Sequence, residues 1–341
     1  MRRIFAGALV GFVVLNTGCA TPAGAPAQST ITTRIDSVLA KVAQQEVRSD
    51  RKTPWAIMHA IVGFQSEAVV QDAETGKQMN AIQFLLTGAK YEGGPIFRAV
   101  DGSLTLPRVK EVEHHPNQCL MILSLAGVDA SHALLADDGK SYQVADLIDA
   151  AKRGYTDDQE PGWTLVALSN YLSFAEQWKA DNGRAYRVAD ILKRAIERDP
   201  LNEAEGGTHH LFGVSYAFRK CDPKHREPVG VWRAAQAYLT EHTQTVKRFQ
   251  LEDGGFSAGF FKEQAQPKSP SDLVFSTGHT LEWLTFALAP EELRQPWVER
   301  AVRRLVEEIE SHPNDAFSDG GIYHAVNALR LYRDALTSKG K

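Results

Sequence analysis

The sequence predicts an all-α fold of about twelve helices arranged as six pairs. Apolar residues recur with a helical period through most of the 341 residues. Within each expected pair, one helix is apolar on all sides and the other carries one charged face, which is typical of an inner and an outer layer. A histidine or tryptophan also stands near the start of each apolar helix, at intervals of about 50 residues, the length of a helix-turn-helix unit.

Six such pairs predict an (α/α)6 toroid over 31–335, in which the inner helices surround a central funnel. The outer and inner helices of the pairs are expected at 31–48 with 55–66, 76–88 with 115–127, 142–152 with 163–174, 185–197 with 208–219, 230–249 with 278–288, and 296–310 with 322–335. The connections 89–113 and 250–277 are long for a compact domain, so we expect each to form a wall or lid over the funnel. A small β-hairpin is expected near 96–106, around the turn pair Asp101-Gly102.

An internal repeat supports the helix-turn-helix unit. The segment 136–146 recurs at 180–190, with Ala, Asp, Gly, Tyr, Val, Ala and Asp matching in place. In each copy an Asp-Gly or Asn-Gly pair supplies a turn, and the residues after it begin the next outer helix.

The first eighteen residues have the features of an export signal. Met1-Arg2-Arg3 precedes a short apolar run, and Thr17-Gly18-Cys19 resembles the lipobox of bacterial lipoproteins. We therefore expect a signal peptide at 1–18, lipidation of Cys19 and a flexible tether at 19–30. The alternative is ordinary cleavage after Ala27. The protein is then expected in the cell envelope as an outer-membrane lipoprotein facing the periplasm or the surface, or otherwise in the periplasm or medium, with residues 336–341 as a tail.

The amino-acid composition argues against nucleic acid as a binding partner. With 43% hydrophobic and 23% charged residues the chain is ordinary for a globular protein. A net charge of −4, with Lys and Arg scattered among Asp and Glu, leaves no basic face for nucleic acid. Beyond Cys19 there are only Cys119 and Cys221, which we expect to be two buried thiols rather than one disulfide.

The sharpest local feature is Gly278-His279-Thr280-Leu281-Glu282-Trp283. His279 and Glu282 are three residues apart, so they share a helix face. Glu282 is then expected to orient His279 for proton transfer, or both side chains to bind one metal. A capped helix start with an ion pair is the alternative that assigns no function.

Further candidate residues stand near the starts of the other inner helices. The candidate catalytic set is His279, Glu282, His324, His210 and His115. The candidate substrate-binding set is Trp55, His59, Trp163, His209, Trp283 and Tyr323. Because adjacent residues point to different sides of a helix, at most one histidine of His114-His115 and one of His209-His210 is expected to face the funnel.

These residues do not decide whether the site binds a metal. No cofactor is required for histidine acid-base chemistry, but a divalent metal at the histidine cluster would need three imidazoles and a carboxylate such as Glu282, Glu111 or Glu113. No His-x-x-x-His or Cys-x-x-Cys spacing supports it locally.

The Gly278-His279-x-x-Glu282-Trp283 element resembles the Gly-His-x-x-Glu-Trp element of the N-acylglucosamine and cellobiose 2-epimerases, which are (α/α)6 barrels. The resemblance implies two histidines that move the proton at sugar C2, with His279 and His324 in those roles.

Two other resemblances point to a fold rather than a reaction. Gln250-x-x-Asp253-Gly254-Gly255-Phe256 is similar to a motif of terpenoid cyclases and protein prenyltransferases, where it ties helix ends together. The Asp-x-Asp-Asp acid of class II cyclases is absent, which disfavours terpene cyclisation. The pattern from Glu92-Gly93-Gly94-Pro95 to Trp283 looks like a family of exported bacterial proteins without an assigned activity.

The sequence therefore favours a carbohydrate-active enzyme, an epimerase or a lyase-like catalyst, with a glycan or another small molecule as its ligand. A non-catalytic binding or scaffold lipoprotein and a metal-dependent hydrolase are the alternatives.

Overall fold

The computed structural model describes residues 30–221 and 230–337. The expected signal peptide, the lipidation site Cys19, the tether except for Thr30, and the tail from residue 338 lie outside these residues. From Ile31 onward the described residues belong to one compact unit.

Twelve α-helices carry most of the described chain, and five pairs of short strands connect some of them. The helices are α1 (Ile31–Ala43), α2 (Pro54–Phe64), α3 (Ala81–Thr87), α4 (Gln118–Leu125), α5 (Val144–Arg153), α6 (Gly162–Tyr171), α7 (Val188–Ile196), α8 (Thr208–Lys220), α9 (Val231–Arg248), α10 (Pro270–Ala287), α11 (Pro296–Ser311) and α12 (Asp319–Thr337). The strands are β1 (Val69–Gln71), β2 (Gln78–Asn80), β3 (Lys90–Tyr91), β4 (Gly94–Pro95), β5 (Arg98–Val100), β6 (Ser103–Thr105), β7 (Ala133–Leu135), β8 (Ser141–Gln143), β9 (Trp178–Lys179) and β10 (Ala185–Tyr186).

Each expected helix occurs, with two shifted starts. Helix α10 begins at Pro270 rather than at 278, because the Ser269 hydroxyl accepts a hydrogen bond from the Asp272 amide and proline suits the first helical position. Helix α3 begins at Ala81 rather than at 76, because Asn80 caps it and the residues before form β2. His279 therefore lies in the middle of α10 and not at its start.

The hairpin predicted near 96–106 is confirmed as β5–β6, which pairs Val100 with Ser103 across the predicted turn. Four further hairpins were not predicted, because strands of two or three residues are too short to show an alternating pattern. Two of them, β7–β8 and β9–β10, lie in the internal repeat. In each copy a turn glycine with positive φ precedes an Asp that caps the next helix through its carboxylate, Asp146 for α5 and Asp190 for α7.

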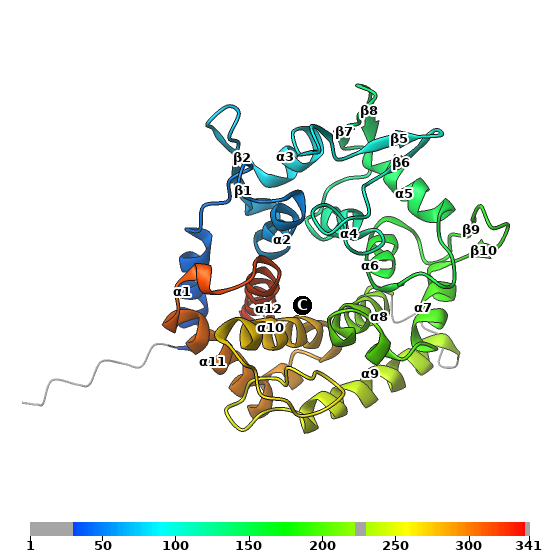
Figure 1. The fold of residues 1–341 in the computed structure, drawn as a ribbon. Helices are drawn as coiled ribbons and strands as arrows, with labels where there is room; N and C mark the ends of the chain where they lie inside the picture. Colours follow the sequence, from blue (N-terminus) through cyan, green and yellow to red (C-terminus); the bar gives the residue numbers. More distant parts are fainter. Residues whose placement is uncertain (1–29, 222–229, 338–341) are drawn as a thin grey trace, which may run out of the picture. The chain divides into compact units, whose positions relative to one another are not determined.

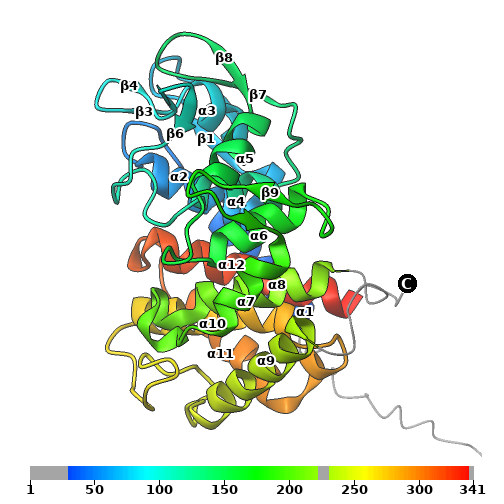
Figure 2. The same ribbon diagram turned by 90° about the vertical axis from the view of Figure 1, so that its right-hand side faces the viewer.

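The even-numbered helices contact one another in a closed sequence. Helix α2 packs on α12, α12 on α10, α10 on α8, α8 on α6, α6 on α4, and α4 on α2. The odd-numbered helices lie outside them: α1 packs on α11 and α12, α5 on α4 and α6, and α9 on α7, α8 and α10 (Figure 1). Hairpins β3–β4 and β7–β8 gather near α3 and α5 (Figure 2). The apolar and the amphipathic helices of the sequence are thus the inner and outer ones.

Glycines allow the inner helices to approach closely. A Cβ built on Gly213 of α8 would lie 2.3 Å from the carbonyl oxygen of Gly162 in α6. A Cβ on Gly278 of α10 would lie 2.8 Å from the Cβ of Ala325 in α12. The backbones therefore touch at these crossings, close to His209 and His279.

The Gln250–Phe256 motif fastens the loop after α9 to α11. The Gln250 amide donates to the carbonyls of Gly254 and Trp297, at 2.8 and 2.7 Å. Asp253 accepts from Arg304 Nε at 2.9 Å. Cys119 and Cys221 are both buried. Among the described residues, no helix combines the length and the apolar character needed to span a membrane.

Candidate functional site

The inner helices bring histidines and tryptophans into one continuous group, which we call the histidine cluster. Its rings contact one another in order: His59–His324 with centroids 5.3 Å apart, His324–His279 at 4.2 Å, His279–His209 at 5.2 Å, His209–Trp163 at 4.3 Å and His209–His115 at 5.3 Å. The ring of Trp55 contacts that of His59, with centroids 3.8 Å apart and planes tilted by 42°. All six inner helices, or the residues just before them, contribute a ring.

Three of these imidazoles converge on one point. His209, His279 and His324 each offer a ring nitrogen, and these nitrogens all lie within 4.8 Å of one another. The three side chains come from α8, α10 and α12 and are 2–3% exposed. Three converging, buried imidazoles are a donor set that suits Zn, Cu, Fe or Ni.

Hydrogen bonds fix the orientation of two cluster histidines through the backbone. His59 Nδ1 lies 2.7 Å from the Trp55 carbonyl, and His279 Nδ1 lies 2.7 Å from the Phe275 carbonyl. Because a carbonyl only accepts, Nδ1 carries the proton in both rings. The lone pair is therefore on Nε2 of each ring.

A third cluster histidine, His324, is oriented by a carboxylate. His324 Nδ1 donates to Glu282 Oε2 at 2.7 Å, and Asn327 Nδ2 donates to Glu282 Oε1 at 2.6 Å. The expectation that Glu282 orients His279 is therefore wrong: it orients His324 of the neighbouring helix. A spacing of three residues leaves side chains about 60° apart around the helix axis, and α12 packs against the side on which Glu282 lies.

His209 differs from the other cluster histidines because neither of its ring nitrogens has a hydrogen-bond partner within residues 30–221 and 230–337. The indole nitrogens of Trp55 and Trp163 and Nε2 of His324 are also buried without a partner. Buried polar groups are almost always paired, so several unpaired ones in one place indicate a site that a ligand, ion or water completes.

Burial sets the protonation of the cluster. It lowers the pKa of His324 and of His59 to about 3, and it lowers the pKa of His209 and His279, with neighbouring histidines adding to the effect. Burial also raises the pKa of Glu282 to about 7. At neutral pH the imidazoles are thus uncharged and have lone pairs to offer.

A second group lies on the other side of His209. His115, Glu205 and His209 offer ligand atoms within 4.8 Å of one another. His115 Nδ1 lies 2.8 Å from Glu160 Oε2, and burial raises the pKa of Glu205. As expected for adjacent histidines, His115 is buried and His114 is exposed.

Four predicted residues lie outside the cluster. His210 points between α8 and the outer layer, where its ring faces Tyr238 of α9 at 6.2 Å. Trp283 donates to Ser215 Oγ at 3.0 Å inside the core, and Tyr323 packs against Phe64. Glu113 accepts from the Cys119 amide at the start of α4.

Glu111, also considered as a ligand, pairs with Lys110 instead. Three participants were not predicted from the sequence: Glu160, Asn327 and Phe275. Asn327 follows His324 by three residues, a spacing that places both on one helix face. No comparable local signal marks Glu160, because it reaches His115 from a loop 45 residues away in the chain.

The loop between α9 and α10 contacts residues next to the cluster through Phe260. A Cβ on Gly206 would lie 2.3 Å from Phe260 Cγ, so the Phe260 ring packs on the glycine next to Glu205. The same ring contacts Phe275 with centroids 6.3 Å apart, and Phe275 contacts His279 at 4.4 Å. Phe260 has φ 52°, an unfavourable conformation for a non-glycine residue.

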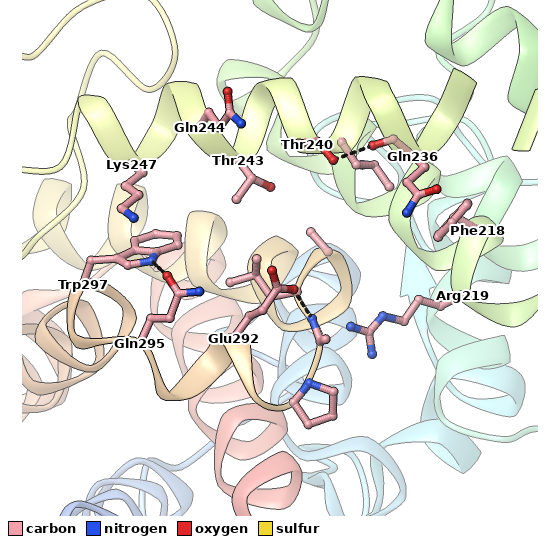
Figure 3. A pocket seen from close by; sticks show the side chains of 15 residues that line it. Phe218, Arg219, Gln236, Thr240, Thr243, Gln244, Lys247, Glu292, Gln295 and Trp297 are labelled. Atoms are coloured by element: carbon pink, nitrogen blue, oxygen red, sulfur yellow. Dashed lines mark hydrogen bonds between the residues drawn. The ribbon is translucent and has the colours of Figure 1, made fainter. Parts of the chain in front are cut away.

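A separate pocket of about 580 Å³ lies at the C-terminal ends of α8 and α10, bordered by α9 and the start of α11 (Figure 3). Amides and hydroxyls line much of it, including Gln236, Thr240 and Gln244, and Lys247 lies 5.6 Å from the ring of Trp297. Its lining contains no histidine, cysteine or aspartate. The one carboxylate among its lining residues, Glu292, accepts a hydrogen bond from the Ala289 amide at 2.8 Å. The converging imidazoles lie in the histidine cluster, at the other end of α8.

Comparison with known proteins assigns no function. No protein-family model matches the chain, and no curated protein matches it significantly.

Proposed function

We propose that the domain is an (α/α)6 toroid. Two observations support this arrangement. Apolar and amphipathic helices alternate along the chain, and the six apolar ones contact each other in a sequence that closes on itself through α2 and α4. In a toroid the inner helices surround one central axis. This arrangement accounts for rings from all six of them meeting in one cluster.

Within this fold, His209, His279 and His324 are the proposed ligands of a divalent transition metal. The observation that carries the proposal is their three ring nitrogens within 4.8 Å of one another, all buried. A tetrahedral zinc with Zn–N of about 2.0–2.1 Å holds its ligand nitrogens about 3.3 Å apart. The ring nitrogens must therefore approach one another by at most about 1.5 Å when a metal binds.

The hydrogen bonds favour this chemistry. Protein ligands of metals commonly donate their other ring N–H to a carbonyl or carboxylate, which fixes the tautomer and makes the free nitrogen a better donor. His279 does so with Phe275, and His324 with Glu282. Low pKa values also mean that protons compete weakly with a metal at neutral pH.

The reaction class we propose is metal-dependent hydrolysis of a small molecule or glycan. When bound, a divalent metal supplies Lewis-acid activation of water and of the substrate oxygen. The protein's own contribution is to hold the imidazoles, to exclude bulk water and to orient the substrate. The indole N–H groups of Trp55 and Trp163, which are buried without a partner among the described residues, are suited to donate to substrate oxygens. Export with a lipid anchor at Cys19 remains part of the proposal.

Metal-free proton transfer on a sugar is the second candidate, and the Glu282–His324 pair favours it. A carboxyl with a pKa of about 7 next to an imidazole is able to buffer proton movement near neutral pH. It predicts deuterium incorporation at sugar C2 in D2O by protein that has been treated with chelator. Absence of exchange after chelation, with hydrolysis restored by metal, would exclude this candidate.

The test of the metal centre is metal content by plasma mass spectrometry. The full chain is purified without a polyhistidine tag and dialysed against zinc, manganese, iron, nickel or copper. We expect bound metal in the wild type and its loss in His279→Asn and in His324→Asn. His132→Asn serves as the matched control, because His132 is exposed in the turn before β7.

Hydrolysis is then measured on panels of glycosides, esters and phosphoesters before and after chelation. Metal binding that His279→Asn and His324→Asn leave unchanged would contradict the proposed site. A metal that binds at these residues without any effect on turnover would contradict the proposed reaction.

A further inference from the structure

We infer that His209 bridges two metal ions, one held with His279 and His324 and a second held with His115 and Glu205. The first site is that of the proposed function, and the inference rests on it. The second site adds a carboxylate ligand to the centre, so the whole would be a two-metal centre built from five residues that lie in, or just before, the four inner helices α4, α8, α10 and α12.

The second site has the same geometric quality as the first. Its three ligand atoms, one each from His115, Glu205 and His209, also lie within 4.8 Å of one another. Glu205 stands in the 3-10 turn Glu205–Gly207 that leads into α8, and its carbonyl accepts from the Thr208 hydroxyl at 2.8 Å. Gly206 and Gly207 have φ of 63° and 87°, which allows the tight turn that brings Glu205 next to His209.

The two sites share one design. In the first, His324 donates Nδ1–H to Glu282, and in the second, His115 donates Nδ1–H to Glu160. Each donation leaves a lone pair on Nε2 and strengthens it as a ligand. Among the described residues, Glu160 keeps one carboxylate oxygen buried without a partner. Glu205 offers a carboxylate oxygen within 4.8 Å of the ligand atoms of His115 and His209.

His209 lies between the two carboxylate-anchored histidines, and it has no anchor of its own. A neutral imidazole has one N–H, and burying that group without an acceptor is unfavourable. Both ring nitrogens of His209 are buried and unpaired. Coordination of one ion by each nitrogen satisfies both. In that state the ring has lost its N–H proton to the solvent, and the resulting negative charge, together with Glu205, offsets part of the charge of two cations.

Zinc stoichiometry by equilibrium dialysis tests the bridge, using the full chain. Wild type is expected to bind two zinc ions per chain, and Glu205→Gln or His115→Asn to bind one. Matched controls are Glu203→Gln and His114→Asn, two neighbours outside the proposed ligand set, and both are expected to keep two. Circular dichroism melts of the metal-free variants show whether each one folds.

Loading with copper(II) gives a second test that does not depend on the number of ions bound per chain. Two copper ions joined through one imidazolate couple magnetically, so wild type at full loading is expected to show a coupled electron paramagnetic resonance spectrum. Glu205→Gln is expected to show the spectrum of an isolated ion.

Different results would overturn the bridging role of His209 and the first metal site. One zinc in wild type that is lost in His324→Asn, but kept in Glu205→Gln and His115→Asn, would overturn the bridge and leave the proposed function standing. Two ions with uncoupled copper spectra would also overturn it. No bound zinc, nickel, iron, manganese or copper in wild type would overturn both.

Discussion

Replacing Gly213 by alanine tests whether the contact between α6 and α8 determines the geometry of the histidine cluster. The new Cβ would lie 2.3 Å from the Gly162 carbonyl oxygen and 2.7 Å from the Gly162 Cα. These are backbone atoms, so no side-chain rotation relieves the contact. His209 lies four residues earlier in α8, about one turn away.

The size of the effect follows from the distance. An ordinary contact needs about 3.4 Å, so the two helices must separate locally by about 1 Å, and overpacking of this kind costs typically 1–3 kcal/mol. Alanine recovers at most about 1 kcal/mol of that through its better helix propensity. Metal ligands tolerate displacements of only about 0.2 Å, so a shift that reaches His209 also weakens metal binding.

The assay is urea unfolding of the metal-free protein followed by circular dichroism, with zinc affinity measured in parallel. Gly213→Ala is expected to lower the free energy of unfolding by about 1–2 kcal/mol and to weaken zinc binding. Gly88→Ala is the control, because its Cβ would meet mainly the Phe84 side chain, at 3.2 Å. A Gly213→Ala protein as stable as the wild type would refute the backbone contact, and an unchanged zinc affinity would refute its link to the cluster.

Two further predictions concern the cluster itself. Because burial lowers the pKa of His324 to about 3, the imidazole stays neutral as pH falls from 8 to 5. In Glu205→Gln, which is expected to hold only the first ion and needs no His209 imidazolate, zinc occupancy is therefore expected to remain constant over that range. Occupancy that declines from pH 7 to 6, as for histidines of ordinary pKa near 6.5, would show that the ligands are not the buried ones. Phe260→Gly keeps the φ of 52° without strain and removes the ring that packs on Gly206. The variant is expected to lose its metal to a chelator faster than the wild type while binding the same number of ions. Stopped-flow absorbance measures the rate of this loss. An unchanged rate would mean that the α9–α10 loop does not limit access.

The helices were predictable because the way each one is buried determines the pattern of apolar residues in its own sequence. A helix covered on both sides is apolar all round, as α6 and α10 are, and a helix covered on one side is amphipathic, as α7 and α11 are. Helix starts were less predictable where capping decides them. Ser269 and Asn80 move the starts of α10 and α3 by several residues through hydrogen bonds to the first turn, a local effect that the apolar period does not contain.

The site was predictable in its histidines and not in its pairings. His59, His115, His209, His279 and His324 were all expected from their positions near or within the apolar helices. Which carboxylate meets which imidazole depends on the rotation of neighbouring helices, and this is set by contacts such as Gly278 against Ala325. For that reason Glu282 was assigned to His279 on its own helix and not to His324 across the crossing. The same reason removes His210 from the cluster, since a rotation of about 100° per residue turns it toward α9.

The distribution of unsatisfied polar atoms argues that the cluster is maintained for a ligand rather than for stability. Six of the sixteen buried side-chain atoms without a partner, among the described residues, belong to Trp55, Glu160, Trp163, His209 and His324. Each such atom costs about 1–3 kcal/mol relative to a paired one, and apolar side chains of similar volume would avoid that cost. Their concentration around His209, where rings from all the inner helices meet, is expected where an ion and a bound substrate complete the hydrogen bonds and coordination. If the proposed ion and substrate bind at the cluster, their binding energy offsets this cost.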